Sequence, residues 1–285
     1  MEEQPFNDLF FVRGGCPIHY WLVGDKDSPL ITFIHGAGVD HSMFAPQTAV
    51  IAPSFQSLLW DMRGQGKSQP SVTPFSVHSA AEDLLALLDN LGYSQTVLVG
   101  VSLGGTIAQE VALCFPERVK ALVIVGAPCN TLPLTPLTQL LLQVFMCLVR
   151  RAPIGVIRRS LAFFASKRKD ARRYVYEAFV QIREQDHRQI WEAFYDIFRP
   201  VPALKSINVT HKILLIRGQY DIFWNRWLLD FWAKHRPGIL YAVLPKAGHL
   251  ANWDEASIFN ELLVNFLNNV LLGGIASQLK SPSPT

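Results

Sequence analysis

Short apolar runs alternate with longer stretches of helical periodicity along most of the chain. Helical spacing predicts helices at about Val77–Leu91, Leu103–Phe115, Asn225–Lys234 and Glu255–Val270. Buried strands are predicted at Leu30–Ile34, Ser57–Trp60, Thr96–Val99, Ala121–Val125, Lys212–Ile216 and Ile239–Leu244. Several of these strands lack polar alternation, which is typical of parallel strands covered by helices on both faces. The pattern therefore predicts an α/β fold rather than a sandwich or a helix bundle.

Two further segments complete this prediction. Phe10–Gly24 is typical of a hairpin that turns at Gly14 and Gly15, which raises the expected sheet to about eight strands. Between about Asn130 and Ser206 the alternation stops, and apolar residues recur only at helical spacing. We interpret this segment as an all-helical lid of about four helices, inserted after the sixth strand. The expected organisation is a core of residues 1–129 and 207–272, a lid of residues 130–206 and a flexible tail of residues 273–285.

The composition excludes several classes of protein. Of the 285 residues, 49% are hydrophobic and 17% are charged, against about 25% charged residues in an average soluble domain, so general disorder is excluded. The net charge of +3, from 26 Lys and Arg against 23 Asp and Glu, is too small to indicate a nucleic-acid binder. The longest apolar stretch, about Leu132–Val149, is interrupted by proline and polar residues. It falls short of the ~20 apolar residues that span a bilayer.

The N-terminus and the cysteines indicate the compartment. The sequence MEEQPFNDLF is acidic and lacks a basic segment followed by a long apolar one, so we expect no secretory signal. The cysteines form no CxxC pair and have no metal-ligand spacing, so no metal site is expected among Cys16, Cys114, Cys129 and Cys147. Both observations indicate a reducing, cytoplasmic setting.

A G-x-S-x-G sequence, Gly100 to Gly104, contains the first candidate catalytic residue. The string alone is weak, but the residues before Ser102 predict a strand and the residues after it predict a helix. Ser102 would then lie on the sharp turn between them, where the flanking glycines avoid a Cβ clash. A helix N-cap would explain the serine but not glycines on both sides. We therefore identify Ser102 as the candidate nucleophile.

A serine hydroxyl needs a base to take its proton and a third group to orient that base. Among eight histidines, His249 follows a predicted strand and precedes the final helix, and open α/β sheets bind ligands at the carboxyl ends of their strands. Asp221 follows another strand in the same way. The order Ser102, Asp221, His249 is the Ser, acid, His order of α/β-hydrolases. Asp254 is the other candidate acid, but we expect it only to cap a helix.

The early loop His35-Gly36-Ala37-Gly38 is a candidate source of oxyanion donors. In an acyl-transfer site, one donor is the backbone N–H of the residue after the nucleophile and the other comes from such a loop. The predicted donors are the N–H groups of Leu103 and Ala37. We expect His35 to hydrogen-bond the loop backbone rather than to take part in catalysis.

A glycine-rich turn follows the predicted strand that ends at Trp60. Residues Asp61 to Ser68 read D-x-R-G-x-G-x-S, and the glycines permit a tight loop. Arg63, paired with an acidic side chain, would stiffen this loop. We therefore interpret the turn as a structural support beside the site.

The set HGAG, DMRGQGKS, GVSLGG, GQYD and AGH resembles the α/β-hydrolase superfamily, and specifically its small capped group of esterases, enol-lactonases and carbon–carbon bond hydrolases. The resemblance covers roughly residues 10–271 and implies an α/β-hydrolase fold, with a mostly parallel sheet flanked by helices. Ser102 excludes a resemblance to haloalkane dehalogenases and epoxide hydrolases, which carry Asp there. Two positions depart from the pattern: Phe44 stands where Trp is usual, and the usual proline after the acid is missing.

The lid carries an unusual concentration of charge. Nine Lys and Arg lie between Arg150 and Arg173, against the single acid Asp170, so the rest of the chain is mildly acidic. A solvated outer face is the favoured interpretation, and attraction of an anionic substrate or an anionic membrane surface is the alternative. Together with the lid's apolar residues, three aromatic side chains are expected to line a mostly apolar acyl pocket: Phe44, Trp224 and Trp253.

These observations predict a serine hydrolase that needs no cofactor and cleaves small carboxylic esters or lactones through an acyl-enzyme. Ser102 would attack, His249 would move the proton, Asp221 would hold the imidazole, and the N–H groups of Ala37 and Leu103 would stabilise the oxyanion. A carbon–carbon bond hydrolase of ketonic substrates would use the same triad. A ligand-sensing module that turns over slowly and signals through its lid is a further alternative.

Overall fold

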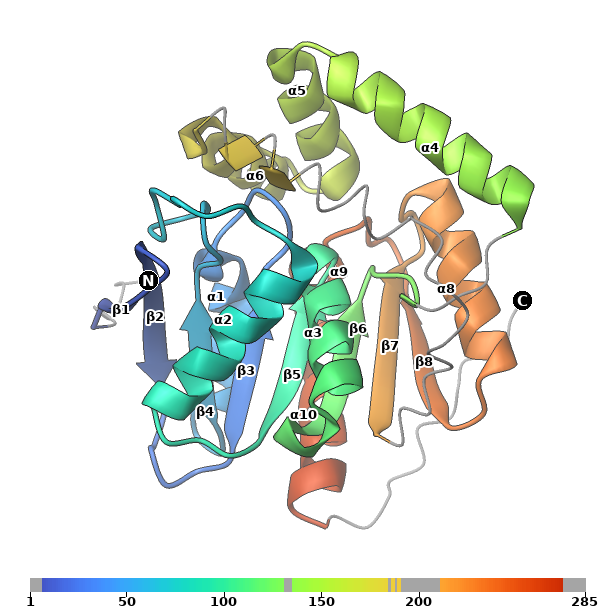
Figure 1. Ribbon diagram of the computed structural model, residues 1–285. Helices are drawn as coiled ribbons and strands as arrows, with labels where there is room; N and C mark the ends of the chain where they lie inside the picture. The colour runs from blue at the N-terminus through green and yellow to red at the C-terminus, as the bar shows by residue number, and fades with distance from the viewer. Residues whose placement is uncertain (1–6, 131–134, 184–185, 188, 191–210, 274–285) are drawn as a thin grey trace.

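The computed structural model describes residues 7–130, 135–183, 186–187, 189–190 and 211–273 (Figure 1). Its centre is an eight-stranded sheet in the order β1-β2-β4-β3-β5-β6-β7-β8. The antiparallel pairs are β1 with β2 and β2 with β4, and every other pair is parallel. The strands are β1 Leu9–Arg13, β2 Cys16–Val23, β3 Leu30–Ile34, β4 Gln56–Trp60, β5 Thr96–Val101, β6 Val119–Val125, β7 Lys212–Gly218 and β8 Ile239–Leu244.

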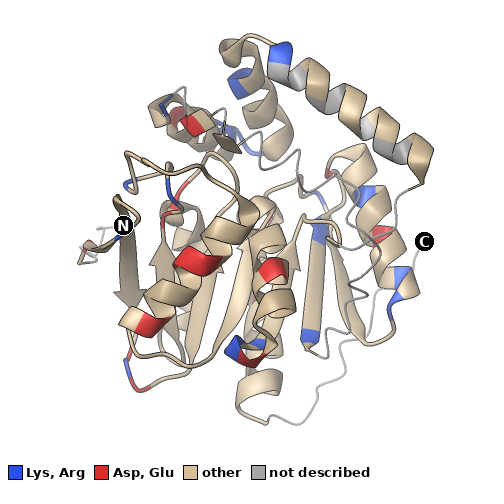
Figure 2. Ribbon diagram, viewed as in Figure 1, with Lys and Arg blue, Asp and Glu red and all other residues tan. Residues whose placement is uncertain are grey.

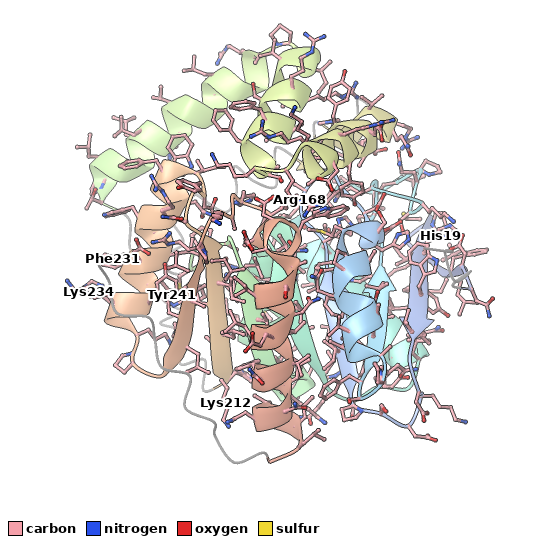
Figure 3. All side chains as sticks on the ribbon, turned by 180° about the vertical axis from the view of Figure 1, so that it is seen from behind. His19, Arg168, Lys212, Phe231, Lys234 and Tyr241 are labelled. Carbon is pink, nitrogen blue, oxygen red and sulfur yellow. The ribbon has the colours of Figure 1, made fainter. Side chains whose placement is uncertain are left out.

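Helices cover both faces of this sheet. One face is covered by α2, α3 and α8, and the other by α1 and α10, which lie in front when the molecule is seen from behind (Figures 1 and 3). These helices and the short α9 are α1 Ala45–Ile51, α2 Val77–Asn90, α3 Leu103–Cys114, α8 Phe223–His235, α9 Ala251–Asp254 and α10 Ala256–Leu271. Short 3-10 turns occur at His41–Phe44 and Pro116–Arg118. No helix within the described ranges is both long and apolar enough to cross a membrane.

A helical insertion lies between β6 and β7, over the edge of the sheet where β5 and β6 end (Figure 1). It contains α4 Pro136–Arg151, α5 Ile154–Ala165 and α6 Lys169–Gln181. The predicted position of the insertion after the sixth strand is confirmed. The last part of the predicted lid, residues 191–206, lies outside the described residues, as does most of the predicted tail.

The local sequence explains why these elements form. Every residue of β5 is buried, which is why this strand reads as an apolar run without alternation. Helix α2 begins with a capping box, in which the Ser76 hydroxyl accepts the Ser79 N–H at 2.9 Å and the Ser79 hydroxyl accepts the Ser76 N–H at 2.9 Å. The predicted strands and helices occur within a few residues of their expected bounds, and the fold prediction is confirmed.

Candidate active site

Ser102 lies on the turn from β5 to α3, as predicted, with its backbone at φ 54° and ψ −118°. L-residues rarely adopt this conformation, which costs energy of order 1–3 kcal/mol. Hydrogen bonds on both sides hold the turn: the Ser102 N–H donates to the Val125 carbonyl at 2.8 Å, and its carbonyl accepts the Gly105 N–H at 2.9 Å. A Cβ on Gly100 would lie 2.3 Å from the Gly104 carbonyl oxygen, so the glycines are needed for this turn to form.

Gly104 is the most crowded of these glycines. A Cβ at this position would lie 2.0 Å from the Ile34 carbonyl oxygen, which belongs to the central strand β3. We therefore expect Gly104→Ala to lower the free energy of unfolding by at least about 2 kcal/mol, measured by urea denaturation. Gly155→Ala is the matched control, because Gly155 is helical and a Cβ there would meet nothing within 4 Å. Equal changes in the two variants would contradict this account of the turn.

His249 and Asp221 form a hydrogen-bonded pair. Nδ1 of His249 lies 2.8 Å from Oδ1 of Asp221, which is 3% exposed and follows β7. The carboxylate also accepts the Ile222 N–H at 2.7 Å and the side-chain N–H of Asn225 at 2.9 Å. These acceptor bonds fix the carboxylate, so His249 donates from Nδ1 and keeps Nε2 free to accept a proton.

Gly126 links this pair to the nucleophile turn. It follows Val125, whose carbonyl accepts the Ser102 N–H, and a Cβ at Gly126 would lie 3.1 Å from both Nδ1 and Cε1 of His249. Its carbonyl also accepts the side-chain N–H of Asn225 at 2.9 Å. The structure thus brings the Ser102 backbone and the His249 ring to two consecutive residues at the end of β6, Val125 and Gly126. Sequence reasoning missed Asn225, although its four-residue spacing from Asp221 at the start of a helix was a usable signal.

Two opposing effects set the pKa of His249. Burial lowers it, whereas the charge of Asp221 and the hydrogen bond to it raise it, and the net result is a pKa above the usual 6.5. A general base must be neutral, so activity is full above this pKa and is lost as the pH falls through it. We expect the acid limb of the pH profile of kcat/KM to have an apparent pKa above 6.5. An acid limb below 6.5 would contradict the expected upward shift, and a profile without an acid limb would contradict the assignment of His249 as the base.

The early loop, His35 to Gly38, is held by hydrogen bonds between the His35 side chain and backbone groups, as the sequence predicts. His35 is fully buried, with Nδ1 at 2.7 Å from the Gly36 carbonyl, and Nε2 accepts the Met62 N–H at 2.9 Å. Burial lowers the pKa of His35, which keeps the ring neutral and suits these two roles. The expected structural role of His35 is confirmed. Ala37 directly follows Gly36 in this loop. Leu103 is the first residue of α3, where an N–H has no partner within its own helix.

The glycine-rich turn is a structural support, as expected. Arg63 makes a bidentate ion pair with Asp83 of α2, in which one of the two bonds measures 2.5 Å and the Asp83 side chain is fully buried. Asp61 is buried as well, and its carboxylate accepts the N–H groups of His41 and Lys67 at 2.8 Å each. Gln65 reaches the early loop, where its side-chain oxygen accepts the Gly38 N–H at 2.6 Å.

The three predicted pocket residues lie in different environments. Phe44 is fully buried, with its ring centroid 4.8 Å from that of Phe33. Trp253 lies in α9 and stacks on Tyr174 of α6, with 4.8 Å between ring centroids. Trp224 lies on α8 and is 40% exposed. Trp253 therefore lies where the insertion meets the core, and the lining of an acyl pocket by these residues stays a prediction.

The basic cluster of the insertion is partly neutralised by its own neighbours. Arg168 pairs with Asp170 at 2.7 Å, and Arg173 pairs with Glu177 at 2.7 Å, both on exposed surface. Arg172 donates to the Ser166 carbonyl at 2.6 Å. Figure 2 shows basic residues on α5 and also on α8. These contacts favour the interpretation of a solvated outer face.

The expected role of Asp254 as a helix cap is wrong. Asp254 is the last residue of α9, and the N-cap of α10 is Glu255. The Asp254 carboxylate instead accepts hydrogen bonds from Gly248 and from the turn between α5 and α6. This side chain therefore joins the insertion to the loop of His249.

One group of side chains in the described ranges has the spacing of a metal site. The ligand atoms of His78, Glu110 and Cys114 lie within 4.8 Å of one another. They belong to α2 and α3 and include none of the predicted site residues.

Comparison with known proteins agrees with this architecture. The chain is 32% identical to 3-oxoadipate enol-lactonase 2 of Acinetobacter baylyi over 107 residues, which are 38% of the chain and 40% of the enol-lactonase. It is 28% identical over 266 residues to a 2-hydroxy-6-oxononadienedioate/2-hydroxy-6-oxononatrienedioate hydrolase of Klebsiella pneumoniae, covering 88% of the chain and 90% of that hydrolase. An enol-lactonase structure from Burkholderia xenovorans superposes with a TM-score of 0.75 at 22% identity, covering 91% of the chain and all of that structure.

The exclusion of epoxide hydrolases as relatives was too broad. The chain is 29% identical over 116 residues to human epoxide hydrolase 4, which is 40% of the chain and 32% of that protein. The similarity thus extends to this class, although the nucleophile position of the chain is Ser102. A family model described as "alpha/beta hydrolase fold" matches residues 29–256, which are most of the chain. The chain therefore belongs to the α/β-hydrolase fold family.

Proposed function

We propose that this chain is a serine hydrolase that cleaves carboxylic esters or lactones through an acyl-enzyme. The observation that carries the proposal is the Asp221–His249 pair, at 2.8 Å, beside the turn that holds Ser102 in its strained conformation. A buried carboxylate that orients a histidine, next to a serine projected from a sharp turn, is the arrangement that activates a hydroxyl.

In the first half of the reaction, Ser102 Oγ attacks the carbonyl carbon of the substrate while Nε2 of His249 takes the hydroxyl proton. The carbonyl π electrons move onto oxygen, and the N–H groups of Ala37 and Leu103 stabilise the resulting oxyanion. The oxyanion then collapses, and His249 gives its proton to the leaving alkoxide. In a lactone this oxygen stays attached to the acyl group.

In the second half, a water molecule attacks the acyl-enzyme and gives a proton to His249. The acid is released and the proton returns to Ser102 Oγ, so the enzyme is regenerated. Asp221 stays ionised throughout and stabilises the imidazolium. Each of these roles is filled by a group of this chain, with water as the only co-reactant.

A carbon–carbon bond hydrolase is the second candidate function. The observation that favours it is the 28% identity over 88% of the chain to a hydrolase of 2-hydroxy-6-oxononadienedioate or its triene analogue. The same triad would serve both reactions, and the substrate separates them.

A substrate panel tests the proposal. Nitrophenyl esters of increasing acyl length, a set of lactones and a 2-hydroxy-6-oxo dienoate are compared by kcat/KM. We expect esters or lactones to be preferred over the dienoate by at least about 10-fold, equivalent to 1.4 kcal/mol of transition-state binding. A preference for the dienoate would favour the second candidate. Very slow turnover of every substrate would favour a ligand-sensing module.

A further inference from the structure

The carboxylate of Asp254 lies between the helical insertion and the loop that precedes α9. Its Oδ2 accepts the N–H groups of Gly248 at 2.6 Å and of Lys167 at 3.0 Å. Its Oδ1 accepts the hydroxyl of Ser166 and the N–H of Arg168, the latter at 3.4 Å. Three of these donors belong to the turn between α5 and α6, and the remaining one belongs to the loop before α9. Figure 3 shows Arg168 where the insertion meets the core.

The Asp254 carboxylate offers two oxygens that both accept, and three of the four groups bonded to it are backbone N–H groups, which can only donate. An asparagine has one accepting oxygen, so its own N–H group would face one or more of these donors. The Ser166 hydroxyl can also accept, as it does from the Arg168 N–H at 2.9 Å, so we expect Asp254→Asn to weaken the junction less than Asp254→Ala. Ser166 is only 1% exposed, so water cannot easily replace the bond that its hydroxyl donates.

Both chain neighbours of His249 are bonded at this junction. The Gly248 N–H donates to Asp254, and the Leu250 N–H donates at 2.7 Å to the carbonyl of Ala165, the last residue of α5. A Cβ on Gly248 would lie 3.2 Å from Oδ2 of Asp254 and 3.4 Å from backbone atoms of the α5–α6 turn. The backbone of His249 is therefore held to the insertion on both sides.

The insertion also contacts the early loop. The Phe179 ring of α6 packs so closely that a Cβ on Gly38 would lie 2.0 Å from it. Two residues after this loop, Oδ1 of Asp40 lies 2.9 Å from the Tyr174 hydroxyl of the same helix. The same helices therefore touch the loop that supplies the proposed oxyanion donor and the loop that supplies the proposed base.

We propose that Asp254 is a positioning residue, which couples the helical insertion to the general base. Its carboxylate fixes the loop of His249 to the α5–α6 turn, so that the imidazole meets Ser102 in a reactive geometry only while the turn is in place. This inference rests on the proposed function. It makes the insertion part of the machinery that orients the base, in addition to covering the site.

The test compares Asp254→Asn, Asp254→Ala and a matched control, Asp170→Asn. Asp170 lies in α6 of the insertion, and its carboxylate pairs with the Arg168 side chain on the exposed surface rather than with the His249 loop. For each protein, kcat and KM are measured with a nitrophenyl ester. Hydrogen exchange is followed by mass spectrometry for the peptides that contain residues 165–168 and 248–250.

We expect both Asp254 variants to lower kcat by about 10- to 100-fold while KM changes little, because a misplaced base slows the chemical step. Hydrogen exchange should accelerate in both peptides, and Asp170→Asn should leave both readouts unchanged. An increase in KM with unchanged kcat would overturn the proposal, because it would show that Asp254 only seats the insertion. Unchanged exchange at residues 248–250 would overturn it as well.

Two fallback experiments cover the cases in which the Asp254 variants do not fold or the wild-type protein has no esterase activity. If neither Asp254 variant folds, Ser166→Ala removes a single donor of the junction without touching the His249 loop, and a smaller loss of kcat with faster exchange at 248–250 is expected. If the wild-type protein hydrolyses no ester or lactone, the proposed function fails, and exchange in Asp254→Asn alone decides the coupling. Faster exchange at 248–250 then supports it, and unchanged exchange overturns it.

Discussion

Replacing Ser102 with alanine is expected to lower kcat for the best ester or lactone substrate by at least about 1,000-fold. The hydroxyl is the only group that the proposed mechanism uses to form the acyl-enzyme, so its loss removes the covalent route. The oxyanion donors and the acyl pocket would remain, and the residual rate would report on them. Initial rates over a range of substrate concentrations measure the effect.

The matched control for this variant is Ser54→Ala. Ser54 is an exposed serine in the turn between α1 and β4, where the hydroxyl has no role in the proposed site. We expect this control to keep wild-type kcat, and thermal unfolding should show that both variants are folded. A Ser102→Ala variant that keeps a tenth or more of the wild-type activity would contradict the covalent mechanism.

The variant Asp221→Asn is expected to lower kcat by about 100- to 10,000-fold. The carboxylate accepts a hydrogen bond from the Nδ1–H group of His249 at 2.8 Å. This leaves Nε2 unprotonated and able to act as the base. An asparagine can donate to Nδ1, and the imidazole would then carry its proton on Nε2 and could not accept one from Ser102. The loss of the negative charge also leaves the imidazolium unstabilised.

The pH profile gives a second readout for Asp221→Asn. The charge of Asp221 raises the pKa of His249 against the effect of burial, so its removal should move the acid limb of kcat/KM to lower pH. Asp230→Asn is the control, because the Asp230 carboxylate is half exposed and bonds to Arg217 and Tyr241, neither of which is a residue of the proposed site. An Asp221→Asn variant within about 3-fold of wild-type kcat would contradict the role of Asp221 as the orienting acid.

The fold could be predicted from sequence because its main signals are local. The central strands β3, β4 and β5 are buried along their whole length and therefore read as apolar runs. The strands Leu30–Ile34 and Ile239–Leu244 are predicted at their observed bounds. Ser102 was identified for a similar reason. The turn that holds it at φ 54° leaves no room for a Cβ at Gly100 or Gly104, so the backbone constraint appears directly in the sequence as glycine.

The contacts that sequence reasoning missed are the ones that join distant segments. Asp254 bonds to Ser166, which is 88 residues away, and no local pattern distinguishes such an acid from a helix cap.

The seven-residue helix α1 was missed because it is short and contains a proline in its first turn. The Phe44 ring is fully buried against Phe33, and its place in an acyl pocket stays a prediction.

The central claim is that Ser102 is a nucleophile activated by His249, and an active-site-directed fluorophosphonate tests it most directly. The protein is incubated with the probe, and the adduct is located by intact-mass and peptide mass spectrometry. We expect one adduct per chain on Ser102, much slower labelling in His249→Ala and no adduct in Ser102→Ala. Absence of labelling in the folded wild-type protein, or an adduct that persists in Ser102→Ala, would contradict the claim.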